Sequence, residues 1–224
     1  MADIGTDHGY VPIYLVKNKI CTKAIALDIN IGPLKRAQEH IREYQMEAYI
    51  ETRQSDGLTA LKPGEAETIV ITGMGGDTIM KILKSGEAIA GAAGEIILQP
   101  QSEQEETRKF LVREGYHILE EDMVSGDGKF YPIMRVRKAL GQWNAGAFGY
   151  DRIALKYGPV LLGCKHPVLK EYLLWQQGQK EKVLMQVREN ALGESRKKNE
   201  RRILNELADI HAALNLFLNK EVEE

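Results

Sequence analysis

The opening segment of this 224-residue chain, Asp3-Ile4-Gly5-Thr6-Asp7-His8-Gly9-Tyr10, constrains the fold more than any other stretch. It has the layout of a strand, a glycine turn and the start of a helix, and the next apolar run ends at Asp28. Glycines let the backbone approach a ligand closely, and an acid about twenty residues on can accept hydrogen bonds from ribose hydroxyls. The pattern predicts a site for an adenosine-containing cofactor.

The residue at position 7 indicates which cofactor this is. The dinucleotide fingerprint needs a second glycine where this chain has Asp7. A carboxylate there would repel the pyrophosphate of NAD, whereas it suits the cationic sulfonium and amino groups of S-adenosylmethionine (SAM). We therefore predict SAM as the cofactor. The alternative is that Asp7 only caps the helix that starts near Tyr10.

The first two-thirds of the chain alternates between strand and helix patterns. Short apolar or β-branched runs predict strands at residues 24–28, 49–53, 67–72 and 94–98. Helical spacing covers residues 12–17, 33–46, 77–83 and 102–114. We expect Ser102 to cap the last of these helices, with Glu105 completing a capping box. Such alternation predicts right-handed βαβ units around a parallel sheet.

Two strand patterns then follow each other without a helix between them. They cover residues 116–123 and 130–137, and the link at 124–129 is rich in turn residues. Strands joined this way must be antiparallel, so we expect the sheet to end in a hairpin. That ending is typical of class I SAM-dependent methyltransferases (an α/β, Rossmann-like fold) and foreign to dinucleotide dehydrogenases.

The remaining chain predicts a separate helical domain. We place the methyltransferase domain at residues 1–140, a glycine-punctuated connecting segment at 141–164 and a coiled-coil-like helical hairpin at 165–224. Gly193 marks the break between the helices and Ser195 can cap the second one. The alternative is two separate helices packed on the main domain. The predicted seam comprises Ile203, Leu207, Ile210, Leu214 and Phe217, facing a weaker stripe of Leu169, Leu173, Gln176, Lys180, Val183 and Val187.

Charge is distributed unevenly between these parts. Residues 1–150 carry a net charge of −4 and residues 151–224 a net charge of +2. A run of five cations near the predicted hairpin tip is of the kind that contacts phosphates, although a solvated helix face is equally consistent with it. These cations are Arg196, Lys197, Lys198, Arg201 and Arg202.

Other features exclude several classes of protein. Cys21 and Cys164 lie far apart and no histidine cluster accompanies them, so neither a disulfide framework nor a metal site is predicted. No stretch is apolar enough to span a membrane, and we expect a cytoplasmic protein. Because only Met1 and Ala2 precede the glycine turn segment, we expect that the chain has lost the start of its first strand.

Two further stretches complete the predicted site. Asp56-Gly57 follows the third strand, where Asp56 can accept from the adenine amine and Gly57 lets the ring approach, although Asp-Gly is also a common turn. Thr72-Gly73-Met74-Gly75-Gly76 lies at the carboxyl edge of the sheet. It replaces the Asn/Asp-Pro-Pro-Tyr motif of many amino-methyltransferases. That absence favours methylation of a ring nitrogen, for which Asp7, or less favourably His8, can take the proton released from the neighbouring amine.

Together these motifs resemble one known family. Asp3 to Leu15, Thr72 to Gly76, Leu98-Gln99-Pro100-Gln101 and Gly128-Lys129-Phe130-Tyr131 resemble the bacterial tRNA (adenine-22-N1)-methyltransferase family, over nearly the whole chain. The resemblance implies a class I methyltransferase domain with a coiled-coil-like C-terminal domain. It also implies SAM as donor, S-adenosylhomocysteine as product and N1 of an adenine in the tRNA D-loop as acceptor.

The resemblance also implies residue roles. The cofactor contacts would be Asp3, Gly5, Thr6, Asp7, Asp28, Asp56, Gly57, Gly73 and Met74. The target-base side would comprise Gly75, Gly76, Gln99, Pro100 and Tyr131. Tyr131 can stack on an extruded adenine, or it is simply a half-buried strand tyrosine.

Two rival functions remain open from the sequence. One is a methyltransferase acting on a small molecule or protein, and the other is a noncatalytic SAM-sensing or RNA-binding module. We expect tRNA as the partner, no membrane association, and a monomer or weak homodimer.

Overall fold

The computed structural model describes residues 1–139, 151–190 and 193–218, and the chain divides into two compact units. Within the described residues, the first unit comprises 1–121 and 131–139, and the second comprises 122–130, 151–190 and 193–218. Much of the connecting segment predicted at 141–164, including Gly146 and Gly149, lies outside the described residues.

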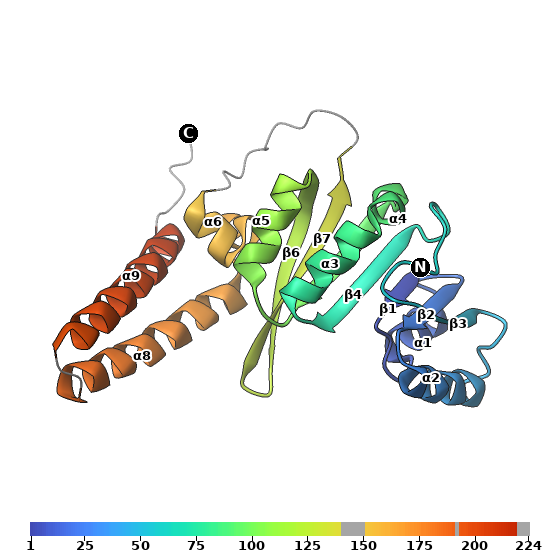
Figure 1. The fold of residues 1–224 in the computed structure, drawn as a ribbon, viewed down its shortest axis with the longest axis horizontal. Helices are drawn as coiled ribbons and strands as arrows, with labels where there is room; N and C mark the ends of the chain where they lie inside the picture. The colour runs from blue at the N-terminus through green and yellow to red at the C-terminus, as the bar shows by residue number, and fades with distance from the viewer. Residues whose placement is uncertain (140–150, 191–192, 219–224) are drawn as a thin grey trace. The chain divides into compact units, whose positions relative to one another are not determined.

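The described residues of the sheet form seven strands in the order β3-β2-β1-β4-β5-β7-β6 (Figure 1). The bounds are β1 (Ala2–Ile4), β2 (Ala24–Asp28), β3 (Ile50–Gln54), β4 (Thr68–Met74), β5 (Glu95–Pro100), β6 (Tyr116–Gly126) and β7 (Lys129–Lys138). The first five strands pair in parallel and β7 runs antiparallel to β5. The predicted class I methyltransferase fold, with its terminal hairpin, is therefore confirmed.

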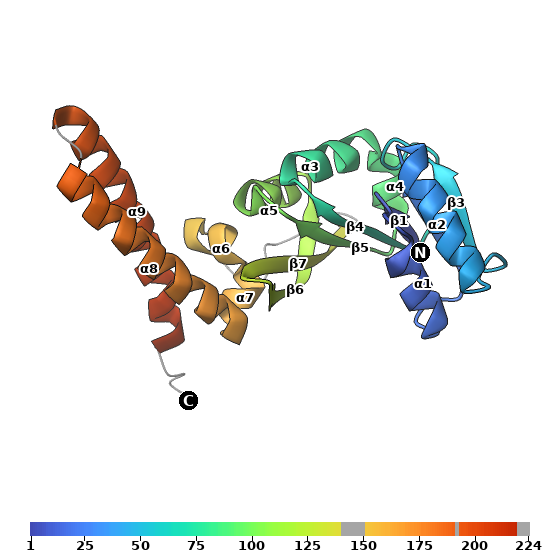
Figure 2. The same cartoon turned by 90° about the horizontal axis from the view of Figure 1, so that it is seen from below.

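The helices of the first unit are those that connect the parallel strands. They are α1 (Tyr10–Lys17), α2 (Ile31–Glu43), α3 (Gly76–Ser85), α4 (Glu87–Ala92) and α5 (Gln104–Arg113). Strands β2 and β3 are added to the sheet on one side of β1, and strands β4 and β5 are added on the other side. Right-handed crossovers therefore place α1 and α2 on one face and α3 on the other. Figure 2 shows α3 and α5 side by side over the central strands.

The predicted cap of α5 is wrong. Glu103, not Ser102, occupies the N-cap position, and its backbone is left-handed with φ 49°. The carboxylate of Glu103 instead accepts from the amide of Gly76 at 3.1 Å, and the hydroxyl of Ser102 donates to the same carboxylate. A tertiary contact to α3 thus replaces the local capping box.

Boundaries of other elements shift for local reasons. Helix α1 begins at Tyr10, as expected, and so starts two residues before the helical spacing at 12–17, because Gly9 with φ 68° turns the chain there. Helix α2 ends before Gln45, whose φ of 57° breaks the helix, instead of reaching Met46. The β6–β7 turn contains Asp127 and Gly128 with φ 50° and 71°, both positive as a two-residue hairpin turn of this twist requires.

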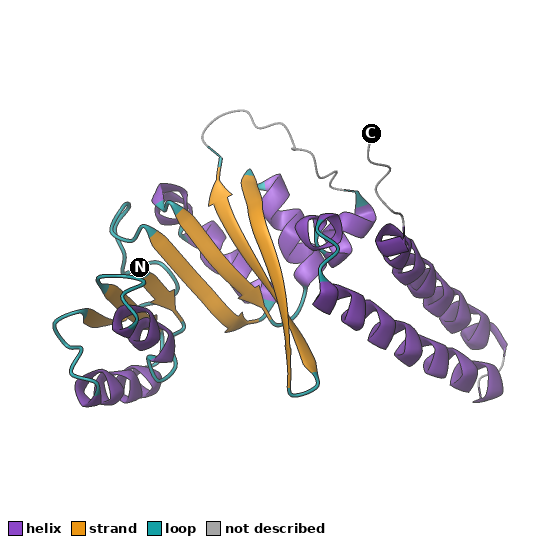
Figure 3. Cartoon of the chain, turned by 180° about the vertical axis from the view of Figure 1, so that it is seen from behind, coloured by secondary structure: helices purple, strands orange, loops and turns teal. Residues whose placement is uncertain are grey.

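The second unit consists of helices and the tip of the β6–β7 hairpin. Its helices are α6 (Arg152–Tyr157), α7 (Pro159–Gly163), α8 (Pro167–Asn190) and α9 (Gly193–Leu218). Helices α8 and α9 pack along each other as the predicted hairpin, which is shown in Figure 3. Ser195 lies inside the first turn of α9, so its predicted capping role is wrong.

The seam between α8 and α9 is largely as predicted. Ile203, Leu207 and Ile210 are buried on α9, and Leu169 and Leu173 are buried on α8. On α8 the third buried position is Leu184, while the predicted Val183 is 40% exposed. Of the polar positions in the predicted stripe, Lys180 forms an ion pair with Glu206 on α9.

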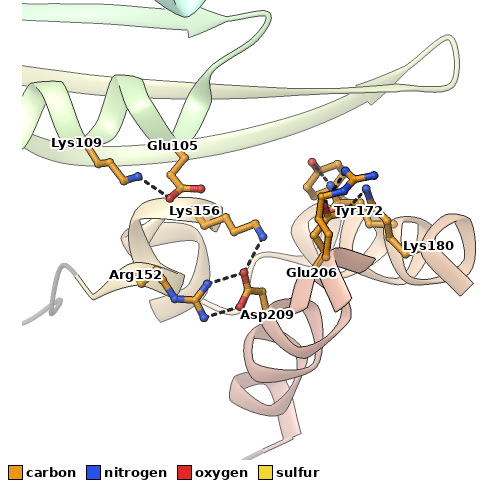
Figure 4. Close-up of polar contacts among 10 residues, drawn as sticks. Glu105, Lys109, Arg152, Lys156, Tyr172, Lys180, Glu206 and Asp209 are labelled. Atoms are coloured by element: carbon orange, nitrogen blue, oxygen red, sulfur yellow. Dashed lines mark hydrogen bonds and ion pairs between the residues drawn. The ribbon is translucent and has the colours of Figure 1, made fainter. Parts of the chain in front are cut away.

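A carboxylate holds α6 on α9 within the second unit. The side chain of Asp209 is 9% exposed and accepts from Arg152 Nη1 at 2.6 Å and Lys156 Nζ at 2.8 Å. Figure 4 shows both cations reaching Asp209. The hydrogen bond from Arg152, followed by that from Lys156, holds the pKa of Asp209 below its usual value. The predicted connecting segment thus contains two short helices, α6 and α7, that sequence patterns missed.

The tip of the β6–β7 hairpin belongs to the apolar core of the helical unit. Met123 is buried together with Leu161, Leu169 and Leu173, and Phe130 packs against it. The ring of Phe130 lies 5.2 Å from that of Tyr172. The hairpin therefore contributes strands to the sheet and side chains to the helical unit.

A buried ion pair joins α5 to β6 inside the first unit. Arg108 is 1% exposed, and its Nε lies 2.7 Å from Oε1 of Glu121. Both side chains are buried, so replacing either one breaks an ion pair that is shielded from water, a change that is strongly destabilising.

We expect Glu121→Gln to lower the free energy of unfolding by about 3 kcal/mol, because it removes the carboxylate that pairs with the buried Arg108 guanidinium. The matched control is Glu120→Gln, one residue away, where the carboxylate is 67% exposed and pairs with Arg135. That change should cost less than about 1 kcal/mol. Urea unfolding followed by circular dichroism measures both, and equal losses would contradict the prediction.

Candidate active site

A cavity of about 390 Å³ opens at the carboxyl ends of the parallel strands. Five of the predicted cofactor residues line it: Gly5, Asp28, Asp56, Gly57 and Met74. Its other lining residues are Ile4, Ile29, Ser55, Leu58, Thr59, Thr78, Lys81, Ile82, Ser85 and Gly86. This is the edge where open α/β sheets bind ligands.

The turn after β1 brings backbone to the cavity wall. Gly5 has φ 76°, and the amides of Gly5 and Thr6 both donate to the carbonyl of Leu27 at 2.8 Å. A Cβ atom on Gly5 would lie 2.0 Å from Cε of Met74. The backbone conformation therefore favours glycine, and the methyl end of the flexible Met74 side chain fills the space beside it. Thr6 itself is buried beside the turn and does not line the cavity.

The acid at the end of β2 is held in place by backbone donors. Oδ1 of Asp28 accepts from the amide of Asn30 at 2.7 Å, while the carbonyl of Asp28 accepts from the amide of Ser55 at 2.9 Å. Ser55 begins the turn that carries Asp56 and Gly57, and Gly57 has φ 57°. The β2 and β3 ends thus share one hydrogen-bonded edge, with both acids at the cavity.

Asp3 lies in the short first strand, behind the turn. It is 5% exposed, and burial raises the pKa of its carboxyl to about 6. The Thr6 hydroxyl lowers that pKa by a smaller amount and the Asp28 carboxylate raises it slightly. Asp3 does not line the cavity.

The two candidate proton acceptors lie outside the cavity lining. The side chain of Asp7 is 63% exposed and accepts from Nη2 of Arg36 at 2.9 Å. This hydrogen bond is the main reason that the pKa of Asp7 is lowered. The ring of His8 stacks on Tyr10 at 5.2 Å and on His40 at 5.3 Å. The lowered pKa makes the Asp7 carboxylate a weaker base. The sequence did not reveal its ion pair with Arg36, because Arg36 is distant in the chain.

The glycine-rich loop predicted at 72–76 covers the end of β4 and the start of α3, and it is held by the end of β5 and the residues after it. The amide of Gly73 donates to Oε1 of Gln99 at 3.1 Å. The amide of Gly76 donates to the carbonyl of Ser102 at 3.2 Å, and a Cβ on Gly76 would lie 2.7 Å from that oxygen. Gly75 is the N-cap of α3. The loop therefore has a defined position at the sheet edge.

The predicted target-base residues separate into different environments. Gln99 and Pro100 are buried at the end of β5, so their side chains face protein. Tyr131 is half-buried near the start of β7 and is not among the residues lining the cavity. In the antiparallel register Leu98 pairs with Met134, so Tyr131 lies toward the carboxyl end of β5. It therefore lies at the same edge of the sheet as the glycine-rich loop.

Comparison with known proteins identifies the family that the sequence motifs resemble. The family model described as TrmK, tRNA (adenine(22)-N(1))-methyltransferase, matches residues 1–211. The tRNA (adenine(22)-N(1))-methyltransferase of Bacillus subtilis strain 168 is 35% identical over 213 residues, which cover 93% of this chain and 86% of that protein.

The chain belongs to this family.

Solved structures agree with this membership. The crystal structure of B. subtilis TrmK superposes with a TM-score of 0.80 and 30% identity, covering 95% of this chain and 91% of that one. Streptococcus pneumoniae Sp1610 in complex with S-adenosyl-L-methionine has a TM-score of 0.79 and 26% identity over the same shares. The predicted TrmK resemblance is confirmed, and with it the enzyme class.

The predicted basic run lies on the first turns of α9. Lys197 lies 3.2 Å from Glu194 and Arg202 lies 3.3 Å from Glu206, so these cations are partly neutralised. Both are exposed, as are Lys198 and Arg201, while Arg196 is half-buried. The run faces solvent, as both phosphate binding and a merely solvated helix face require.

Helix α3 supplies a cavity wall that sequence reasoning missed. Thr78, Lys81, Ile82 and Ser85 line the cavity together. Their spacing of three, four and seven residues places them on one helix face. That spacing, following a glycine-rich loop at the carboxyl edge, is the signal that could have identified them.

Two other observations concern the described residues only. They contain no group of three or more His, Cys, Asp or Glu side chains arranged to hold a metal ion. Among those same residues, no helix is both long and apolar enough to cross a membrane.

We expect Asp3→Asn to stabilise the protein above pH 7 but not near pH 4. The folded-state pKa of about 6 exceeds the usual 3.8, so the wild type loses stability as pH rises from 4 through 6. The gain at pH 8 should be roughly 2–3 kcal/mol, since one pKa unit corresponds to about 1.4 kcal/mol. Urea unfolding across this pH range measures it, and a gain that does not depend on pH would contradict the prediction.

Proposed function

We propose that this chain transfers the methyl group of SAM to N1 of adenine 22 in tRNA. The observation that carries the proposal is the cavity at the carboxyl edge of β1 to β4, lined by Gly5, Asp28, Asp56, Gly57 and Met74. Its position suits an adenosine-containing ligand, and Sp1610, a structural neighbour, was solved with SAM. We expect the reaction in the cytoplasm, catalysed by a monomer or weak homodimer.

The cavity residues suit the separate parts of the cofactor. Asp28, held by the amide of Asn30, accepts from the ribose hydroxyls. Asp56 accepts from the adenine amine, and Gly57 leaves room for the ring. Gly5 and Met74 face the remaining, sulfonium-bearing part of the ligand. When bound, SAM supplies an electrophilic methyl group and a cationic leaving centre.

The acceptor atom sets what the protein must do for the base. N1 of adenine carries a lone pair in the ring plane, so no proton has to leave before the carbon–nitrogen bond forms. The ring becomes cationic and its exocyclic amine acidic, so a nearby carboxylate can take that proton. Asp7 is the proposed acceptor and His8 the secondary one. We expect Asp7→Asn to slow turnover, and full turnover with weakened SAM binding would reject this role.

The substrate class is tested by following the methyl group. Purified protein is incubated with labelled SAM and unmodified bacterial tRNA, and the product is mapped by nucleoside mass spectrometry. We expect one N1-methylated adenine in the D-loop. Labelling of a protein or small molecule, or SAM binding without transfer to any nucleic acid, would each reject the proposed substrate.

We propose that the helical unit binds the tRNA backbone through the basic run. Replacing Arg196, Lys198 and Arg201 with Gln should weaken tRNA binding. It should also reduce the slope of log affinity against log salt by roughly one unit for each phosphate that the variant no longer binds. The control replaces Lys19, Lys62 and Arg113, exposed cations of the first unit, in the same way. Filter binding at several salt concentrations measures both, and equal slopes in the two triple variants would contradict the prediction.

We propose that Tyr131 stacks on the extruded adenine. Tyr131→Ala should lower kcat/KM for tRNA about tenfold or more, because base–aromatic stacking contributes about 1–3 kcal/mol. Tyr131→Phe, which keeps the ring, should retain most activity. SAM affinity, measured by calorimetry without tRNA, should be equal in all three proteins. Full activity of Tyr131→Ala would remove this residue from the site.

A further inference from the structure

The side chain of Gln99 is one of the few buried polar groups of the first unit. It is 9% exposed at the end of β5. Its Oε1 accepts from the amide of Gly73 at 3.1 Å and from Nε2 of Gln101 at 2.8 Å. The acceptor oxygen of this side chain is thus occupied by one backbone amide and one neighbouring side chain of the protein.

The bond to Gly73 repairs an irregularity in the sheet. Strands β4 and β5 pair residue for residue up to Thr72 opposite Gln99, and the register then shifts so that Met74 lies opposite Pro100. Gly73, with φ 75°, is the extra residue. The extra residue of a bulge is left out of the backbone ladder, so its amide needs another acceptor. The Gln99 amide oxygen is that acceptor.

The bulge determines where Met74 points. After it, the carbonyl of Met74 accepts from the amide of Gln101 at 2.8 Å. The Met74 side chain lines the cavity and approaches Gly5. Gly73 is exposed, so without Gln99 its amide can turn toward water, and such a turn would displace Met74. The position of the cavity wall therefore depends on one side-chain acceptor.

We infer that Gln99 is a positioning residue for the cofactor site, acting through the backbone amide of Gly73. This differs from the sequence-based expectation that Gln99 contacts the target base. The inference rests on the proposed function, in that the cavity takes SAM.

The test measures SAM affinity by calorimetry in the full chain without tRNA. Gln99→Met keeps an unbranched side chain of similar length but removes the acceptor. We expect about tenfold weaker SAM binding, equivalent to about 1.4 kcal/mol, within the range for the loss of one hydrogen bond. The matched control is Gln101→Met, which removes a donor to Gln99 and leaves the Gly73 bond in place. Its affinity should stay within twofold of the wild type.

Rescue separates positioning from general loss of structure. Gln99→Glu keeps an acceptor oxygen in either protonation state and should bind SAM within threefold of the wild type. Gln99→Asn keeps the amide but withdraws it by one methylene, so it should weaken SAM binding as Gln99→Met does. The Asn variant also serves if Gln99→Met does not fold, and unfolding temperatures without SAM should show that the variants used are folded.

Three outcomes would overturn the inference. Wild-type protein that binds no SAM would reject the proposed function and this inference with it. Wild-type binding with unchanged affinity in Gln99→Met and Gln99→Asn would reject the inference alone. Unchanged SAM affinity together with abolished transfer to tRNA would show that Gln99 serves the target base instead.

Discussion

The turn at Gly5 is the constraint on which the rest of the site depends. Two consecutive amides, of Gly5 and Thr6, donate to the single carbonyl of Leu27, which fixes the end of β1 against β2. Because β1 contributes only three residues to the sheet, these two bonds are a large part of what holds the carboxyl end of β1 against β2. The turn favours glycine because its φ is 76°, a conformation that side chains rarely adopt, and the methyl end of Met74 fills the space beside it.

From this turn the cavity is built by neighbours in the sheet rather than by neighbours in sequence. The strand order places β1 between β2 and β4, so Asp28 and Met74 flank the same turn although they are 46 residues apart. This is the switch point at which successive connections leave on opposite faces. A cofactor site at this point thus follows from topology, and the residues supply the chemistry.

Local patterns predicted the parts of the fold that depend on local rules. The strand at 24–28, Gly5, Asp28 and Gly57 all follow from strand patterning and turn chemistry, and the seam residues Ile203 and Leu207 follow from helical spacing. The same rules failed where a distant partner decided the outcome. Glu103 adopts a left-handed backbone while its carboxylate binds the amide of Gly76, so the local cap at Ser102 does not form.

The candidate site shows the same division. Glycines and acids at strand ends could be assigned from sequence, because their positions follow from the order of elements. The pairing of Asp7 with Arg36 and the bond from Gly73 to Gln99 could not, since each joins residues more than 25 positions apart. These two contacts alter what Asp7 and Gln99 can do in the site, but the fold does not depend on them.

The β6–β7 hairpin has a consequence for how such a chain can be divided or recombined. Its strands complete the sheet, but Met123 and Phe130 at its tip belong to the core shared by α7, α8 and α9. A chain cut after β7 would leave these apolar side chains exposed to water. Helices taken from a relative and joined after β7 would have to pack against the hairpin tip of a different protein. The natural boundary between the two units therefore runs through a strand pair, and exchange of the helical unit between relatives should carry the hairpin tip with it.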